Sequence, residues 1–415
     1  MTASRSDRFD VVVVGAGLVG SALSALLARR TDFSVALVDV RQTPRFDPQS
    51  DYDLRVSAVS RASEQVLRCA GAWAAIESAR LCPYRVMRVW DARTPPPVHG
   101  EGAGIVFDCA EIGEPNLGYI IENQLMQSAL LEVVAAASQV TSLIPAKVAE
   151  IDITSDQARV RMEDGKTVVT RLIVAADGNA SRVRELAGID VEQRAYKQRG
   201  LVSVVSTELD HQHTAWQRFM PGGPLAFLPL SDGRSSIVWS VPDSECEELS
   251  AMDDDAFCRK VGEAADFVLG RITGSGKRAS FPLTRQHAVR YTIPRCVLIG
   301  DAAHTVHPLA GQGANLGLLD AAALIQCLED ALDTGEDPGD KRVLRRYERR
   351  RRAENQLMLS ALDGLQGLFG NTDPTLRTLR IAGLSLVDRA IPLKNLFMQR
   401  AMGIRGDLPE LAKRR

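Results

Sequence analysis

The sequence predicts an α/β (α+β overall) protein with a parallel-sheet domain, a second domain built on a β-sheet and a C-terminal helical segment. A strand, turn, helix and strand in succession near the N-terminus indicate the first part. Several strand-like segments without intervening helices indicate the second part. A basic stretch with helical periodicity indicates the third. The 415 residues are enough for two or three domains of ordinary size.

The composition excludes several classes of protein. Hydrophobic residues make up 45% and charged residues 25% of the chain, which is typical of a soluble globular protein. The formal net charge of −2 argues against a nucleic-acid binder. The seven cysteines form no C-x-x-C pair, so neither a disulfide framework nor a zinc site is expected. With no apolar signal-peptide core and no uncharged apolar run near ~20 residues, we expect a cytoplasmic protein that does not span the membrane.

The first ordered unit begins with a continuous β-branched run from Phe9 to Val14, which is typical of a strand buried in a parallel sheet. A glycine turn follows, and then a helix is expected over residues 18–30. A second buried strand runs from Phe33 to Val38 and ends at Asp39. Together these segments form one β-α-β unit.

The rest of the chain supplies further strands and helices, with a turn expected at Glu163 to Lys166. The expected strands are 148–162, 167–175, 201–206, 225–230, 235–241 and 296–299, and the expected helices are 120–137 and 315–331. We divide the chain into a first domain of residues 1–75, 120–188 and 280–335, a sheet domain of residues 76–119 and 189–279, and a basic helical segment of residues 336–415.

The turn after the first strand matches G-x-G-x-x-G at Gly15, Gly17 and Gly20, and Asp39 follows about 20 residues later. Gly15 allows the tight turn, Gly17 lets a pyrophosphate approach the backbone, and Gly20 allows close helix packing. The helix N-terminus offers amides and a positive dipole end to phosphates. Asp39 would accept hydrogen bonds from a ribose. The pattern predicts a Rossmann-like dinucleotide-binding domain without distinguishing NAD from FAD.

A second motif, from Gly300 to Gly317, separates these two cofactors. An acid at a strand end, Asp301, followed by glycines that open a helix, can hold a polyhydroxyl chain and direct amide dipoles at a developing negative charge. Reduced flavin has that need and a nicotinamide ring does not, so the motif favours FAD. A third element, from Asp177 to Arg184, follows another expected strand and offers a carboxylate and a flexible turn at Gly178.

These three elements resemble the G-x-G-x-x-G, D-G-x-x-S-x-x-R and G-D-A-A-H-x-x-x-P-x-x-G-Q-G-x-N motifs of single-component flavin aromatic hydroxylases, the para-hydroxybenzoate hydroxylase class. Further segments are similar to the UbiH/UbiF/UbiI (VisC) branch, which hydroxylates ubiquinone precursors. Those segments are 53–60, 71–73, 118–123, 400–404 and 408–409. The resemblance covers the chain from about Asp10 to Pro409.

The resemblance implies roles for the matching residues. Asp301 would bind the ribityl chain of a non-covalently held FAD, and Arg55 would lie beside the flavin. Three residues are expected at the reacting centre. Gly311 and Gln312 would border the isoalloxazine ring, and Pro308 would line the side from which oxygen and substrate approach. The expected cofactor-binding residues are Gly15, Gly17, Gly20, Asp39, Arg55, Asn123, Asp177, Gly178, Arg184, Gly300, Asp301, Gly311, Gln312, Gly313, Ala314 and Asn315. No metal site is expected.

Two positions depart from the family pattern. Asp39 stands where Glu is commoner, and Asn123 stands where many relatives have an Arg near the adenosine. Asp177 and Arg184 would sit in the turn that links the flavin pyrophosphate to the groove for the reductant. Because the chain carries a single dinucleotide fingerprint, we expect NAD(P)H to dock transiently, or a protein electron donor to take its place.

The resemblance also implies the reaction: hydroxylation of the aromatic ring of a polyprenylated phenol or benzoquinol in ubiquinone biosynthesis, with O2 and through a C4a-hydroperoxyflavin. The cofactor supplies the chemistry, and the protein supplies binding and orientation. Two alternatives stay open. One is a hydroxylase of a small soluble aromatic, and the other is a flavin-bound scaffold that organises quinone-pathway proteins without turnover.

The sequence allows two interpretations for each of three groups of residues. Four aromatic residues are expected either to line an apolar substrate pocket or to pack in the sheet domain: Trp216, Phe219, Phe227 and Trp239. The basic C-terminal segment is expected either to be a solvated helix pair or to contact the inner membrane surface or other ubiquinone-pathway proteins. His304 and His307 are expected to be structural rather than metal ligands, since no third ligand is visible.

Overall fold

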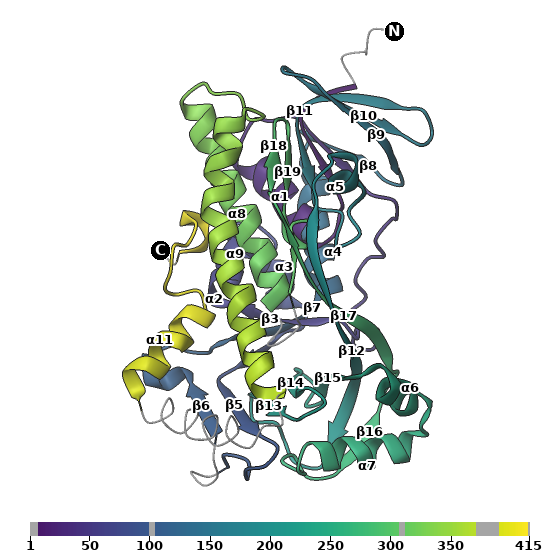
Figure 1. Cartoon of the computed structure of the whole chain (residues 1–415), viewed down its shortest axis with the longest axis vertical. Coiled ribbons are helices and arrows are strands. Elements are labelled where there is room, and N and C mark those ends of the chain that lie inside the picture. Colours follow the sequence, from purple (N-terminus) through teal and green to yellow (C-terminus); the bar gives the residue numbers. More distant parts are fainter. Residues whose placement is uncertain (1–6, 99–103, 307–311, 371–389, 414–415) are drawn as a thin grey trace.

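The computed structural model describes residues 7–98, 104–306, 312–370 and 390–413 and shows a mixed α/β architecture (Figure 1). The described strands form three sheets of eight, nine and three strands. The predicted fold class is therefore confirmed: a parallel sheet with helices, a second sheet, and long C-terminal helices occur in one chain. The N-terminal strand lies in the upper part of the view in Figure 1 and the second sheet in the lower part.

The eight-stranded sheet forms the centre of the upper part, in the order β18-β19-β11-β1-β2-β8, with β10 joining β11 to β9. Its parallel strands are β1 (Arg8–Val14), β2 (Val35–Val38), β8 (Val140–Leu143), β11 (Thr167–Ala175) and β19 (Cys296–Leu298). Its antiparallel additions are β9 (Val148–Ile153), β10 (Ala158–Met162) and β18 (Thr292–Ile293). Strands β1 and β2 are continuous valine-rich runs, as expected for strands of a parallel sheet that is buried on both faces.

Helices α1 (Leu18–Arg30), α4 (Asn123–Ala136) and α8 (Gln312–Asp333) pack together against this sheet, with α1 in contact with both others. Helix α9 (Lys341–Gly370) lies along α8, and the two run side by side in Figure 1. The contact of α8 with α1 depends on Gly317, where an added Cβ would lie 2.4 Å from the Cγ2 of Val19. No helix in the described ranges is both long and apolar enough to cross a membrane.

The nine-stranded sheet has the order β20-β17-β12-β15-β14-β13-β5-β6, with β16 beside β12. Its strands are β5 (Val86–Asp91), β6 (Gly104–Asp108), β12 (Val191–Thr207), β13 (Thr214–Phe219), β14 (Leu225–Pro229), β15 (Ser235–Pro242), β16 (Ile272–Ser275), β17 (Ala279–Ala288) and β20 (His304–Thr305). Helices α6 (Asp243–Ala251) and α7 (Asp254–Ala264) share an apolar core with this sheet. Strand β20 begins three residues after Asp301 and lies at the end of this strand order, so part of the second motif forms an edge of the second sheet.

The three-stranded sheet, β3 (Val56–Ser60), β7 (Gly118–Glu122) and β4 (Cys82–Tyr84), completes the described sheets. Short helices complete the described fold: α2 (Arg61–Cys69), α3 (Trp73–Ser78), α5 (Arg182–Leu186) and α11 (Ile391–Ala401), with single turns at Cys109–Ile112, Gly300–Ala302 and Glu410–Ala412. The turn at 410–412 packs against α2 and α8, so the C-terminal residues return to the first domain.

The structure differs from the sequence-based elements in three places. The expected helix 120–137 begins only at Asn123, because residues 120–122 pair with β3 and β4 as the end of strand β7. The expected strand 148–162 is a hairpin, because the chain turns between β9 and β10, where the backbone amide of Thr154 bonds the carbonyl of Gln157 at 2.9 Å. The expected strand 201–206 is only the apolar end of the seventeen-residue strand β12. Residues 192–197 of β12 are polar and exposed or half-buried, so they carry no apolar pattern that would predict a strand.

Candidate functional site

The loops that follow four parallel strands meet at one edge of the eight-stranded sheet. In the strand pairing, Val14 lies beside both Val38 and Ala175, and Ala175 lies beside Leu298. The next residues along the chain from these strand ends include Gly15, Asp39, Asp177 and Asp301. Open parallel sheets bind ligands in the crevice at the carboxyl ends of their strands. The structure therefore brings the three sequence motifs to the place where a ligand of this fold binds.

The glycine turn has two positions that the fold itself requires and one that it does not. Gly15 has a φ of 107°, and a Cβ there would lie 2.3 Å from the carbonyl oxygen of Ala176. A Cβ at Gly20 would lie 1.9 Å from the carbonyl oxygen of Gly15. A Cβ at Gly17 would meet nothing within 4 Å. Gly17 is also the N-cap of α1 and supplies no capping side chain. Open space before an uncapped helix N-terminus fits a pyrophosphate.

Asp39 braces this turn. Its Oδ2 accepts a hydrogen bond from the amide of Ala16 at 2.6 Å, and its Oδ1 accepts one from the amide of Arg41 at 3.0 Å. The side-chain amide of Gln127 holds the turn from α4 by donating to the carbonyl of Ala16 at 2.6 Å. Because a carboxylate has about four acceptor positions, Asp39 retains capacity for the hydroxyls of a ribose.

Asp301 lies in the turn Gly300–Ala302 at the end of β19, and its side chain is reached by solvent. Protein nevertheless surrounds the carboxyl closely, and this desolvation raises its pKa, while the charges of His304 and Arg55 act to lower it. Asp301 is therefore open to solvent on one side and enclosed by protein on the other. Arg55 is thus one of the charged residues that act on this carboxyl.

The small sheet positions Arg55 and Asn123 together. Val56 pairs with Glu122 across β3 and β7, and the amide of Asn123 donates to the carbonyl of Arg55 at 2.9 Å. The Oδ1 of Asn123 accepts a bond from the hydroxyl of Ser57 at 2.7 Å. The expected cofactor residues Arg55 and Asn123 are therefore neighbours at one end of this sheet.

A buried ion pair that the sequence did not indicate fixes the segment before Arg55. Glu122 is 2% exposed, accepts from the Nε of Arg80 at 2.6 Å, and accepts from the amide of Asp53 at 2.7 Å. The guanidinium of Arg80 also lies 4.2 Å from the ring centroid of Tyr52. Glu122 is thus a positioning residue for the loop that carries Arg55.

The third motif folds as a capped turn that bonds to the second motif. Asp177 accepts from the hydroxyl of Ser181 at 2.5 Å and from the amide of Val183 at 3.1 Å, and Gly178 has a φ of 86°. Buried Arg184 donates through Nη1 to the carbonyl of Ala302 at 2.9 Å. Burial lowers the pKa of Arg184, and the charge of Asp177 opposes that shift. Arg184 therefore ties this turn to the residue that follows Asp301.

A buried charge network lies beneath Asp301. The two oxygens of Asp320, a fully buried residue of α8, accept bonds from the amide of Gly300 at 3.0 Å, His304 Nε2 at 2.5 Å, Arg351 Nε at 2.7 Å and Asn355 Nδ2 at 3.1 Å. Burial alone would raise the pKa of Asp320, but His304 and Arg351 hold it well below its ordinary range. Asp320 thus fixes the chain on both sides of Asp301.

The beginning of α8 contains the remaining described motif residues. Gln312, Gly313 and Ala314 form its first turn and are half-buried. Asn315 is buried, and its side chain bonds β3, accepting from the amide of Ser60 at 2.9 Å and donating to the carbonyl of Ala58 at 2.8 Å. The expected residues Pro308 and Gly311, together with His307, lie outside the described residues.

Apolar side chains flank this segment. Phe219 packs in one cluster with Val306 and Leu316, which stand on either side of residues 307–311 in the chain, and with Val89 and Leu359. The other three aromatic residues singled out from the sequence pack in the core beneath α6 and α7: Trp216, Phe227 and Trp239. Phe219 is therefore the one of the four that contacts the motif region. Within the described ranges, no group of three or more His, Cys, Asp or Glu side chains could hold a metal ion.

His287 makes the stability of the fold depend on pH, independently of any ligand. It pairs with His304 across β17 and β20, and its Nε2 is 3.0 Å from the hydroxyl of Tyr291. Burial lowers the pKa of His287 to about 4, aided by the charges of His304, Arg352 and Arg285. Because the unfolded chain binds this proton near pH 6.5, the stability due to neutral His287 is present above that pH and is lost as the pH falls towards 4.

We expect the variant His287→Gln to have a flatter dependence of unfolding free energy on pH between 4 and 6.5 than the parent chain. Urea denaturation at several pH values measures this. The parent chain, denatured in parallel at the same pH values, is the control. Equal slopes for the parent chain and His287→Gln would contradict a buried neutral His287.

Comparisons with known proteins agree with this geometry. The profile of the FAD binding domain family matches residues 8–361. The chain is 37% identical to the 3-demethoxyubiquinol 3-hydroxylase of Escherichia coli, over 95% of this chain and 98% of the relative. It is 37% identical to the ubiquinone hydroxylase UbiL of Rhodospirillum rubrum, over 97% and 91%.

A solved structure has the same fold. Pseudomonas aeruginosa PqsL in complex with 2-aminobenzoylacetate superposes with a TM-score of 0.74 at 26% identity, covering 91% of this chain and 99% of PqsL. The turn at Gly15, Gly17 and Gly20, with its open space for a pyrophosphate, and the carboxylate of Asp301 at the strand ends fit a flavin dinucleotide. The chain belongs to the FAD-dependent hydroxylases of ubiquinone biosynthesis, the UbiH/UbiF/UbiI family.

Proposed function

We propose that this protein hydroxylates the aromatic ring of a polyprenylated phenol or benzoquinol intermediate of ubiquinone biosynthesis. The observation that carries the proposal is 37% sequence identity to a 3-demethoxyubiquinol 3-hydroxylase over 98% of the length of that relative, in a chain whose motif residues meet at one edge of the parallel sheet. Bound FAD would supply the activation of O2 that the hydroxylation requires.

We assign the parts of the site as follows. The amides around Gly17 would hold the pyrophosphate, Asp39 the ribose, and Asp301 the ribityl chain. The first turn of α8, Gln312 to Ala314, would direct its amides at the pyrimidine edge of the flavin, where the positive end of the helix dipole stabilises negative charge. Arg55 would lie beside the ring. Asn123, Asp177, Arg184, Gly300 and Asn315 would hold the backbone around the cofactor.

The cluster around Phe219 would form the apolar side of the site. Phe219, Val306, Leu316 and Leu359 are all less than a tenth exposed. Such a wall excludes water from a reacting centre and suits a substrate with a hydrocarbon tail. The positions of Pro308 and Gly311, which continue from Val306, remain predictions.

The division of the chain follows from these assignments. Residues 1–75, 120–188 and 280–335 would form the FAD-binding domain, and residues 76–119 and 189–279 the substrate domain. Residues 336–415 would form the C-terminal segment, for which we retain contact with the inner membrane surface as a proposal. Four apolar residues that recur at helical spacing in the sequence of this segment, Leu376, Leu379, Leu386 and Val387, lie outside the described residues. NAD(P)H, or a protein electron donor, would supply the reducing equivalents.

Mass spectrometry of the quinone pool in a strain that lacks this gene tests the proposal. We expect ubiquinone to fall and a prenylated intermediate one hydroxyl short of its product to accumulate. Intact ubiquinone would contradict the proposal and favour a small soluble aromatic as substrate. Complementation with Gln312→Ala, a variant of a residue expected at the reacting centre, distinguishes the flavin-bound scaffold alternative, because a scaffold without turnover would still restore ubiquinone.

The variant Asp301→Ala tests the assignment of Asp301 to the FAD site. We expect it to weaken FAD binding by about tenfold to a hundredfold, because a hydrogen bond to a charged group contributes roughly 1.5–3 kcal/mol. Quenching of flavin fluorescence on titration measures the affinity. The urea midpoint of the apoprotein should not fall, since Asp301 is desolvated without a charged hydrogen-bond partner in the described structure. An unchanged FAD affinity would remove Asp301 from the site.

A further inference from the structure

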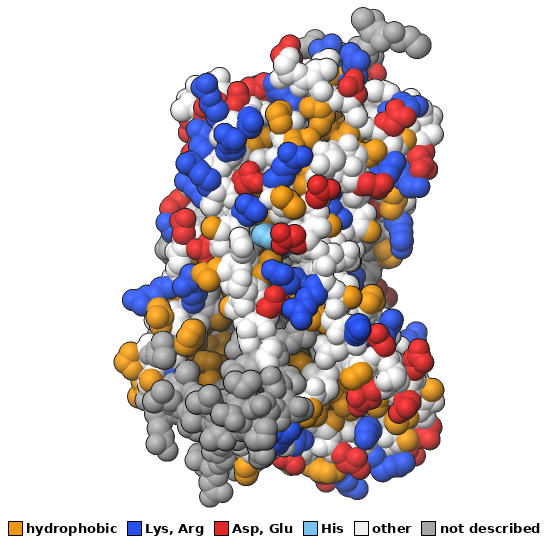
Figure 2. All heavy atoms as spheres, in the orientation of Figure 1, with side chains coloured by type: hydrophobic (Ala, Val, Ile, Leu, Met, Phe, Trp, Pro, Cys, Tyr) orange, Lys and Arg blue, Asp and Glu red, His pale blue; other side chains and the backbone are white. Residues whose placement is uncertain are grey.

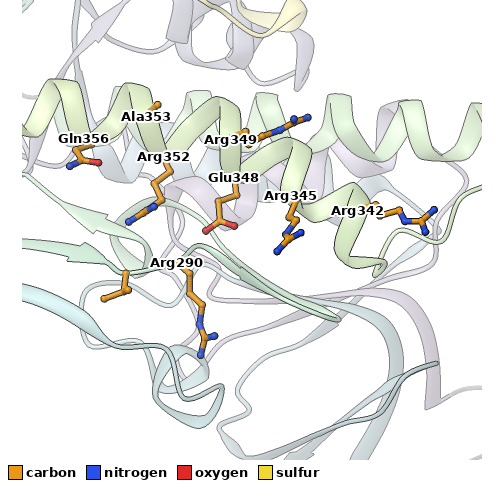
Figure 3. Close-up of a pocket in the computed structure, with 9 residues that line it drawn as sticks. Arg290, Arg342, Arg345, Glu348, Arg349, Arg352, Ala353 and Gln356 are labelled. Atoms are coloured by element: carbon orange, nitrogen blue, oxygen red, sulfur yellow. The ribbon is translucent and has the colours of Figure 1, made fainter.

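A groove of about 700 Å³ lies between α9 and the turn that joins β17 to β18, on the C-terminal segment rather than in the site described above. Its nine lining residues include five arginines and a single acid, and they are Val289, Arg290, Arg342, Arg345, Glu348, Arg349, Arg352, Ala353 and Gln356. Figure 3 shows Arg345 and Arg352 directed from α9 towards the side of the groove that carries Arg290. We name this surface the arginine groove.

Nearby acids offset only part of the positive charge of the arginine groove: Glu348 lines it, and Glu336 lies near enough to Arg342 for the two charges to interact. The carboxylate of Glu348 accepts from the amide of Tyr291 at 2.7 Å and from the hydroxyl of Thr292 at 3.0 Å, so neutral donors hold it in place and its single charge stands against five guanidiniums. Other arginines of α9 have acidic partners: Arg346 pairs with Glu336, and Arg351 with Asp320. Within the described residues, none of the five groove arginines forms an ion pair. In a chain whose net charge is −2, this local excess of positive charge marks a surface for an anion.

The spacing of the arginines indicates an extended ligand. Arg342, Arg345, Arg349 and Arg352 recur every three or four residues on one face of α9, a row about 15 Å long at 1.5 Å per residue. A pyrophosphate would reach about two of these guanidiniums. A partner segment with acidic side chains one helical turn apart could pair with all four arginines of this row. A groove also accommodates a chain segment better than it accommodates a flat membrane surface. Figure 2 shows Lys and Arg side chains gathered over the upper part of this face, where α9 begins.

We propose that the arginine groove is the docking site for an acidic segment of a partner protein. Guanidinium groups bind carboxylates through two parallel hydrogen bonds, so they recognise such a segment with geometric as well as electrostatic specificity. The groove is also joined to the candidate site. Tyr291, whose amide Glu348 holds, accepts a bond from Asn355, and Asn355 bonds Asp320 beneath Asp301. The inference concerns a partner and does not depend on which aromatic compound the enzyme hydroxylates.

The test uses the full chain loaded with FAD and a fluorescent oligoglutamate peptide about as long as the row of arginines. The double variant Arg290→Glu/Arg345→Glu reverses the charge of two exposed residues that line opposite sides of the groove, one on the turn between β17 and β18 and one on α9 (Figure 3). The matched control Lys341→Glu/Arg350→Glu makes the same change in net charge at exposed positions of α9 that do not line the groove. Fluorescence anisotropy measures peptide binding in low and physiological salt.

We expect the groove variant to bind the peptide at least about tenfold more weakly than the parent and the control variant to bind within about twofold of the parent. Raising the salt should weaken parental binding. Equal losses in both double variants would overturn the proposal, because net charge alone would then explain binding. A second outcome would also overturn the proposal. In it, the groove variant loses binding to phosphatidylglycerol vesicles but binds the peptide as tightly as the parent chain. Displacement of the peptide by inorganic pyrophosphate at equimolar concentration would overturn it too.

Discussion

Replacing Gly15 or Gly20 with alanine is expected to destabilise the apoprotein by about 3 kcal/mol, whereas Gly17→Ala should leave its stability unchanged and weaken FAD binding. An added Cβ at Gly15 or Gly20 would stand 2.3 Å or 1.9 Å from a backbone oxygen, so the strand and helix must separate. A Cβ at Gly17 meets only open space, the space that we assign to the pyrophosphate. Urea denaturation and FAD titration of the same three variants measure the two effects.

A control separates the clash from the cost of a positive φ. Gly335 has a φ of 68° in a loop, with nothing within 4 Å of an added Cβ. Gly335→Ala should therefore cost only about 1 kcal/mol, the price of the backbone conformation alone. If Gly17→Ala destabilised the apoprotein as much as Gly15→Ala, all three glycines would serve the fold, and the assignment of Gly17 to the cofactor would fail.

The second large effect is expected at Asp320. Both Asp320→Asn and Asp320→Ala should lower the free energy of unfolding by about 3–5 kcal/mol, because each leaves the buried guanidinium of Arg351 without its counter-charge. Since His304 and Arg351 depress the pKa of Asp320 in the folded chain, its contribution is present above pH 4 and is lost as the pH falls further. Chemical denaturation across pH 3 to 7 measures the loss, and the variants should show a weaker acid dependence.

The surface ion pair of Arg30 and Glu329 supplies the comparison for Asp320. Its atoms are 2.7 Å apart, but the side chains are 39% and 22% exposed, so Glu329→Ala should cost less than about 1 kcal/mol. A loss at Asp320 as small as the loss at Glu329 would mean that the buried network does not hold the turn around Asp301. FAD affinity should also fall in Asp320→Asn, because Gly300 and His304 lose their common partner.

The sequence was sufficient where local pattern determines the structure. The β-branched run at Phe9 to Val14 and the glycines after it specify a buried strand and a tight turn by sterics alone. Asp39 and Asp301 could be placed at strand ends because parallel strands share one carboxyl edge. The comparisons confirm the family that these motifs indicated.

Partners that come from distant parts of the chain could not be predicted. Helix α9 carries eight basic residues between positions 341 and 352, and nothing local distinguishes Arg351, which is 3% exposed and bonds Asp320, from exposed Arg350. Glu122 and Arg80 form a buried pair only because β7 brings the first beside the loop before Arg55. The full extent of β12 was also missed, since its polar half acquires strand structure by pairing with β17.

The most direct test of the account is the absorption spectrum of the purified full chain after reconstitution with FAD and removal of free cofactor, followed by acid precipitation. The account predicts a bound flavin spectrum at about one FAD per chain and release of all the yellow colour into the supernatant as intact FAD. A protein that stays colourless after reconstitution, or flavin that remains with the precipitated polypeptide, would contradict a non-covalent FAD site at the strand ends.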